Sequence, residues 1–85
     1  MRVLGEIPHD KCRIQVFQYG TRFSLKLETP HYEQTFKLRE SEYIENFRDV
    51  AAFCDEAFID DVVRNFLPMH EAAVAAFQRL RDTKD

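Results

Sequence analysis

Residues 12–28 read CRIQVFQYGTRFSLKLE, and apolar and polar side chains alternate along both halves of this stretch. A period of two is typical of a strand with one buried face, because successive side chains of a strand point to opposite faces. We therefore predict strands over 12–19 and 22–28. Gly20 lies between them and is suited to the positive φ of a tight hairpin turn. The inward residues of this pair are Cys12, Ile14, Val16, Phe23, Leu25 and Leu27.

Two further segments extend this hairpin. Residues 32–39 alternate in the same way, and residues 2–7 form a shorter strand with Val3 and Ile7 expected to point inward. The short connections around Pro8 and Pro30 favour antiparallel neighbours in a meander. The inward side of segment 32–39 is Tyr32, Gln34, Phe36 and Leu38. A buried Gln34 needs hydrogen-bond partners, which an edge strand would allow.

From Ser41 onward the apolar period lengthens to about 3.6, which predicts helices. Ser41 and Asp55 are predicted N-caps of a first and a second helix. We expect the apolar stripe of the second helix to cover the sheet, with His70 at the edge of the core and one of its nitrogens hydrogen-bonded. The stripe consists of Ile59, Val62, Val63, Phe66, Met69, His70, Ala73, Phe77 and Leu80.

Pro68 lies inside the second helix. A proline removes one intrahelical hydrogen bond, so a kink is expected at this point. The alternative is a complete break with a new helix starting near Pro68. We favour one kinked helix, because the stripe keeps its phase across the proline.

The predicted fold class is α+β: a four-stranded antiparallel β-meander followed by two C-terminal helices packed on one sheet face, in the order ββββαα. Residues 1–85 form a single domain, with the sheet in 1–40 and the helices in 41–85. A chain of 85 residues buries a modest core, and a partner chain is one way to reinforce it.

Composition restricts the class of function. The net charge is −3, with 12 Lys and Arg against 15 Asp and Glu, which argues against a general nucleic-acid binder. Neither an export signal nor an apolar run of roughly 20 residues, the length that spans a bilayer, is recognised. Cys12 and Cys54 are expected to be reduced core thiols in a cytoplasmic protein, the alternative being a disulfide between them.

The opposite face of the sheet is predicted to lack a cover. It is polar except for Phe17 and Tyr19, so we take it as the candidate interaction surface. The rings would either be buried against a second copy of the chain or another protein, or stack on the bases of a single-stranded nucleic acid, with the cations holding phosphates. We favour the protein partner. The candidate residues are Arg13, Phe17, Tyr19, Lys26 and Lys37.

Catalytic and metal chemistry find little support in the sequence. His9 and His31 lie in turns at the same end of the sheet, but two strand spacings separate these turns by roughly 10 Å, too far for shared metal ligation. Cys12 is predicted to point inward, which suits an inert thiol better than a nucleophile. We therefore predict no catalytic residues, no metal ligands and no cofactor.

Three phrases of the chain resemble an uncharacterised family of small bacterial proteins. They are Ile7-Pro8-His9, then Phe23–Glu28, and then Glu33-Gln34-Thr35-Phe36 with its neighbours. The resemblance implies a bacterial, cytosolic, single-domain protein and implies neither an activity nor site residues. In layout alone, strands followed by a helix also resemble the single-strand-binding coactivators of the whirly type.

The sequence therefore predicts a non-enzymatic protein-interaction module that associates with itself. A weak single-stranded nucleic-acid binder is the second hypothesis. A small enzyme or metal-binding protein is the third.

Overall fold

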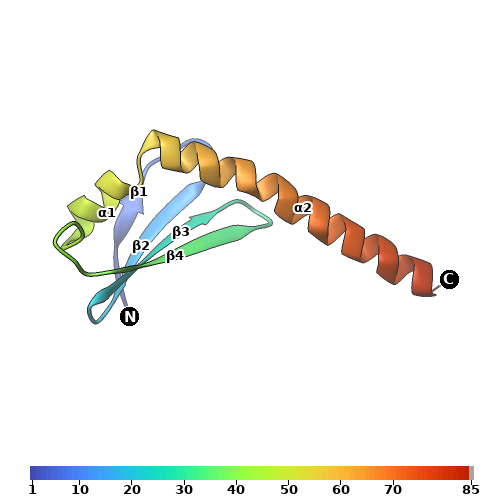
Figure 1. Ribbon diagram of the computed structural model, residues 1–85, viewed down its shortest axis with the longest axis horizontal. Coiled ribbons are helices and arrows are strands. Elements are labelled where there is room, and N and C mark those ends of the chain that lie inside the picture. Colours follow the sequence, from blue (N-terminus) through green and yellow to red (C-terminus); the bar gives the residue numbers. More distant parts are fainter. Residues whose placement is uncertain (85) are drawn as a thin grey trace.

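The computed structural model describes residues 1–84 and has the predicted α+β layout. Four strands come first: β1 (Arg2–Ile7), β2 (Arg13–Tyr19), β3 (Arg22–Glu28) and β4 (Glu33–Arg39). Two helices follow, α1 (Phe47–Phe53) and α2 (Glu56–Lys84). Figure 1 shows both helices on one side of the sheet, with the end of α2 reaching far beyond it.

The sheet is an antiparallel meander with strand order β1-β2-β3-β4, as the short connections predicted. Gly20 has a φ of 56° in the turn between β2 and β3, which confirms its predicted role. The inward residues of β2 and β3 are all buried, and Phe36 and Leu38 of β4 pack against them. From the helical side, the core is completed by Val50, Cys54, Ile59 and Val62.

β1 departs from the prediction at its start. Val3 was expected to point inward, but it is 58% exposed, and Leu4 packs against the core instead. The cause is an irregularity in the β1–β2 register between Val3 and Gly5, where one extra residue enters β1. Such a bulge shifts the alternation by one residue, so side chains before it change face.

α1 begins later than predicted. Asn46, not Ser41, is its N-cap, and the Asn46 side chain accepts a hydrogen bond from the backbone N–H of Asp49 at 3.1 Å. The Ser41 hydroxyl accepts from the N–H groups of Tyr43 and Ile44, both at 3.2 Å, so it closes a turn before the helix. Serine makes the same short-range hydrogen bonds in turns and at helix starts, so its position in the sequence does not distinguish the two.

α2 has the predicted start and continuity. The Asp55 side chain accepts from the N–H of Phe58 at 2.9 Å, which confirms its capping role. The helix runs as one element from Glu56 to Lys84 with Pro68 inside it, so the alternative of a complete break is wrong (Figure 1). In the part of the chain that the structure describes, neither helix is long and apolar enough to cross a membrane.

The path of α2 explains the elongated shape of the molecule, which measures 54 × 26 × 19 Å. At its start, Glu56 and Asp60 bond to His9 and Lys11 in the β1–β2 turn. Further along, the backbone carbonyl of Val62 accepts from the Gln34 side chain of β4 at 2.8 Å. The helix thus crosses the sheet from the β1–β2 turn toward β4 and then leaves it.

The prediction that the whole apolar stripe covers the sheet is wrong in its second half. Ile59 and Val62 are buried, and Phe66 packs against the core, whereas Phe77 and Leu80 are exposed. A four-stranded sheet is roughly 15–20 Å wide, but 29 helical residues extend over about 43 Å, so the helix is too long for its support. Figure 1 shows the second half of α2 with no element beside it.

Candidate interaction surfaces

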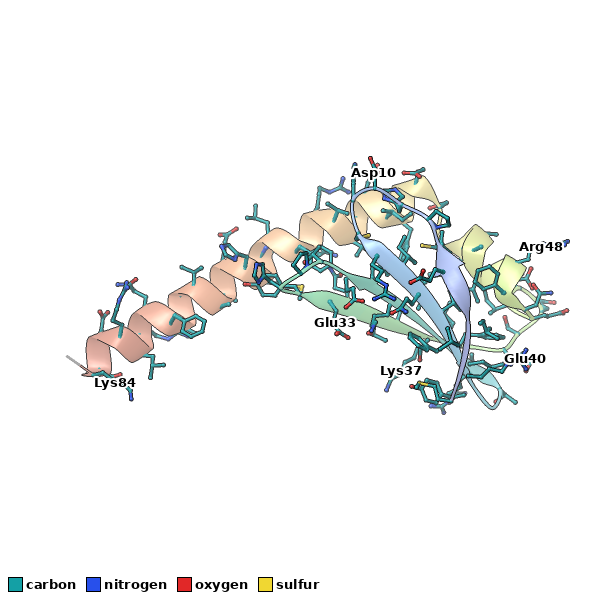
Figure 2. The ribbon with its side chains drawn as sticks, turned by 180° about the vertical axis from the view of Figure 1, so that it is seen from behind. Asp10, Glu33, Lys37, Glu40, Arg48 and Lys84 are labelled. Atoms are coloured by element: carbon teal, nitrogen blue, oxygen red, sulfur yellow. The ribbon has the colours of Figure 1, made fainter. Side chains whose placement is uncertain are left out.

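The five residues predicted as an interaction surface do share the uncovered face of the sheet. Cross-strand pairing aligns Phe17 with Ser24 of β3 and Lys37 of β4, and it aligns Lys26 with Gln15 and Thr35 in the next row. Figure 2 shows Lys37, like Glu33, pointing away from α2. The sheet therefore has one face under the helices and one face open.

The two ends of the open face differ in charge, because one holds ion pairs and the other holds cations alone. Toward one end, Arg13 pairs with Glu6 at 2.8 Å and with Glu28 at 3.7 Å. The hydrogen bond to Glu6 raises the pKa of Arg13, so this guanidinium stays charged. Lys26 also pairs with Glu28, at 3.8 Å. Arg13 and Lys26, two of the five predicted surface residues, thus form ion pairs within the sheet.

The other end of the open face is purely cationic. Arg22 is the cross-strand partner of both Tyr19 and Arg39. Among the described residues, neither Arg22, Arg39 nor Lys37 forms an ion pair. This end could accept an anion, because nothing on the sheet neutralises these charges.

The two rings of the open face are only partly available. Phe17 is half-buried, with the Lys26 ammonium 5.6 Å from its ring centroid. Tyr19 is 49% exposed, and its hydroxyl donates to the Met1 sulfur at 2.7 Å. Both rings border a shallow hollow with Met1, Lys26 and Lys37 on its rim.

A second surface, absent from the sequence prediction, lies on α2. Four of its apolar side chains are exposed: Leu67 at 62%, just before the helix leaves the sheet, and Val74 at 50%, Phe77 at 70% and Leu80 at 51% beyond that point. We call residues 71–84 the projecting segment. The sheet-covering stripe predicted from the sequence includes Phe77 and Leu80 but neither Leu67 nor Val74. The length of the predicted helix, compared with the width of a four-stranded sheet, would have indicated that its end projects beyond the sheet.

The turn end of the sheet brings His9 close to Glu56. The His9 Nδ1 accepts the backbone N–H of Lys11 at 3.1 Å, so Nε2 carries the proton and donates to the Glu56 carboxylate at 3.2 Å. His31 is instead exposed, near the ring of Tyr32. Among the described residues, no three His, Cys, Asp or Glu side chains converge as a metal site would require.

The two cysteines are free thiols in the core. Burial raises the pKa of Cys54 to about 11, helped by the neighbouring Cys12 and by the carboxylates of Asp55 and Glu56. Burial also raises the pKa of Cys12. A thiol that stays protonated at neutral pH is a poor nucleophile, so this pair does not form a reactive site.

No family model matches the chain, and neither a curated protein nor a solved structure matches it.

Proposed function

We propose that the protein is a non-enzymatic interaction module of the cytoplasm that works by associating with a second copy of itself. The observation that carries this proposal is the apolar side of the projecting segment. Val74, Phe77 and Leu80 are each at least half exposed, and they lie in the second half of α2, which no other element of the described chain covers (Figure 1).

Energetics favour a cover for this surface. Full burial of an exposed Leu, Val or Phe side chain stabilises by about 1.5–3 kcal/mol. Val74, Phe77 and Leu80 are 50–70% exposed, so each gains part of that amount, and the three side chains of each of two copies together favour a weak association. The rest of α2 shows what the same stripe does when support is present. Ile59 and Val62 lie on the same side of the helix as Phe77 and Leu80 and are almost completely buried.

Charge supports a partner of the same kind. The chain holds both signs in near balance, 12 basic against 15 acidic side chains, and the open sheet face has paired charges of both signs at one end and cations at the other. Such a distribution matches a copy of itself better than it matches a strongly charged partner. The two free, buried thiols are compatible with the reducing cytoplasm.

The test is sedimentation equilibrium of the full chain from about 1 to about 200 µM, the range in which a small interface is expected to dissociate. The proposal predicts a weight-average mass that rises from 10.1 kDa toward twice that value. A mass that stays at the monomer value across the whole range would contradict the proposal.

A second candidate function is binding of single-stranded nucleic acid. The observation that favours it is the cationic end of the open face, where Tyr19, Arg22 and Arg39 are aligned across three strands. A ring beside unpaired cations could stack on a base while the cations contact phosphates.

Titration of a labelled single-stranded oligonucleotide at low salt tests this candidate. If bases stack on the rings, Phe17→Ala or Tyr19→Ala should weaken binding by about 1–3 kcal/mol. Val74→Ala, on the projecting segment, is the matched control and should bind like the wild type. Equal binding by all variants would leave only non-specific attraction to the cations.

A further inference from the structure

The geometry of α2 assigns the surface of self-association, and this assignment rests on the proposed function. We infer that the projecting segments of two copies pack side by side in antiparallel orientation along Val74, Phe77 and Leu80. In this arrangement Glu71 of each copy lies beside Arg81 of the other.

The exposed apolar side chains have the spacing of a two-helix seam. Leu67, Val74 and Arg81 occupy one recurring position of a heptad, and His70 and Phe77 occupy the other. Leu80 and Ala73 lie on one flank of this seam. Glu71 and Gln78 lie on the opposite flank. A shallow hollow already follows the seam on the surface, bordered by Val74, Phe77, Gln78, Leu80, Arg81 and Lys84.

Two copies can pack along this seam in antiparallel orientation if the two-fold axis passes at the level between Ala75 and Ala76. Val74 and Phe77 are equally far from that axis, so Val74 of each copy is level with Phe77 of the other. On the flank, the small Ala73 leaves room for the Leu80 of the second copy, with an axial offset of about 3 Å. Large side chains thus meet smaller ones, as close packing of two helices requires.

Charge selects the antiparallel orientation. In this register Glu71 and the Arg81 of the second copy differ in level by a single helical rise, about 1.5 Å. Within the described chain, neither side chain forms an ion pair, and Arg81 is held toward the flank by donating to the Gln78 side chain at 2.6 Å. A parallel pair in register would instead place Arg81 against Arg81 in the seam and would not bring Glu71 to Arg81.

The position of the sheet points the same way. α2 joins the sheet through Val62 and His70, so all of the bulk lies at one end of the projecting segment. Antiparallel pairing places the two sheets at opposite ends of the seam. The segment is about 20 Å long, which makes a small interface, and we expect a dissociation constant in the micromolar range.

The experiment measures the dissociation constant of full-length variants by sedimentation equilibrium, with circular dichroism to verify folding. Phe77→Glu should weaken association at least about 100-fold, because it places a charge at the centre of the seam. Ala75→Glu, on the other side of the same helix, is the control and should associate like the wild type. Because both positions are exposed, neither change should disturb the fold.

Charge reversal tests the register. Arg81→Glu and Glu71→Arg should each weaken association about tenfold, and the double variant should return to within about threefold of the wild type. Arg79→Glu makes the same change on the outer side of the helix and should have little effect. A double variant weaker than either single variant would overturn the antiparallel register.

Two results separate this inference from the proposed function. If Phe77→Glu remains dimeric while Tyr19→Glu becomes monomeric, self-association stands and the assignment to α2 is overturned. If the wild type is monomeric at every concentration, both fall.

Discussion

The Tyr32 hydroxyl is hydrogen-bonded to Nδ1 of His70 at 3.0 Å, and the two rings meet edge to face with centroids 5.9 Å apart. Tyr32 precedes β4 in the β3–β4 turn, where its carbonyl accepts from Thr29. Among the described residues, this bond is the one farthest along α2 that ties the helix to the sheet. It therefore marks the point at which the helix begins to project. The prediction that one nitrogen of His70 is hydrogen-bonded is confirmed, whereas its predicted place at the edge of the core is wrong, because His70 is exposed.

Tyr32→Phe should lower the free energy of unfolding by about 0.5–1 kcal/mol, because it removes one hydrogen bond and keeps the ring contact. Urea denaturation followed by circular dichroism measures the change. Tyr43→Phe is the control. Tyr43 is 78% exposed, so loss of its hydroxyl should leave the free energy of unfolding unchanged. Equal stability of both variants would show that the hydroxyl of Tyr32 does not fasten α2.

Gln34 joins the edge strand to the helix, because its side-chain amide donates to the Val62 carbonyl at 2.8 Å. Gln34→Ala should therefore cost about 1–2 kcal/mol, from the lost hydrogen bond and the lost side-chain packing. Thr35→Ala, one residue along β4 on the open face, should stay within about 0.5 kcal/mol of the wild type. The same denaturant titration compares the two, and an equal loss in both would contradict a special role for Gln34.

Gly5 lies directly against the ring of Phe47. A Cβ placed on Gly5 would lie 3.3 Å from the Phe47 Cε2 atom and 3.4 Å from Cζ, at a backbone φ of 158°. Gly5→Val should cost about 1–3 kcal/mol through overpacking.

A double-mutant cycle identifies the cause of that loss. Phe47→Ala removes the obstructing ring, so the double variant should be more stable than the sum of the two single losses predicts. Strict additivity would mean that Gly5 is needed for its backbone conformation alone.

Because of Cys54, the free energy of unfolding should fall as the pH rises into the alkaline range. Its pKa is about 11 in the folded chain against an ordinary value of 9.0, so the folded state holds the proton more tightly. Unfolding therefore releases a proton above about pH 9, and the stabilisation that is complete below pH 9 is lost as pH approaches 11. Cys54→Ala lacks this contribution, so the difference in unfolding free energy between wild type and variant should shrink from pH 9 to 11. A constant difference would contradict the raised pKa.

Alkylation provides an independent measure of the same burial. Iodoacetamide at pH 8 should modify Cys54 slowly in the folded chain and rapidly in urea, because the thiolate is the reacting form. Mass spectrometry after digestion distinguishes Cys54 from Cys12. Equal rates in both conditions would show that the thiols are accessible in the native state.

Local sequence patterns were enough to predict the four strands and, for β2, β3 and β4, the side that faces the core. Alternation along 12–28 is a local property, and a period of two leaves a strand with one apolar face whichever partners it finds. The same holds for the capping of α2 by Asp55 and for its helical period. These features are decided within a few residues of chain, so they can be deduced without the fold.

The places where a strand or helix departs from its predicted packing follow from contacts between separate elements. The bulge before Gly5 reverses Val3, and the meeting of Gly5 with Phe47 involves residues far apart in the chain. The exposure of Phe77 depends on how wide the sheet is and on the direction in which α2 crosses it. An apolar stripe indicates that one side of a helix is buried. Whether the sheet covers that side depends on distances between separate elements, which no local periodicity contains.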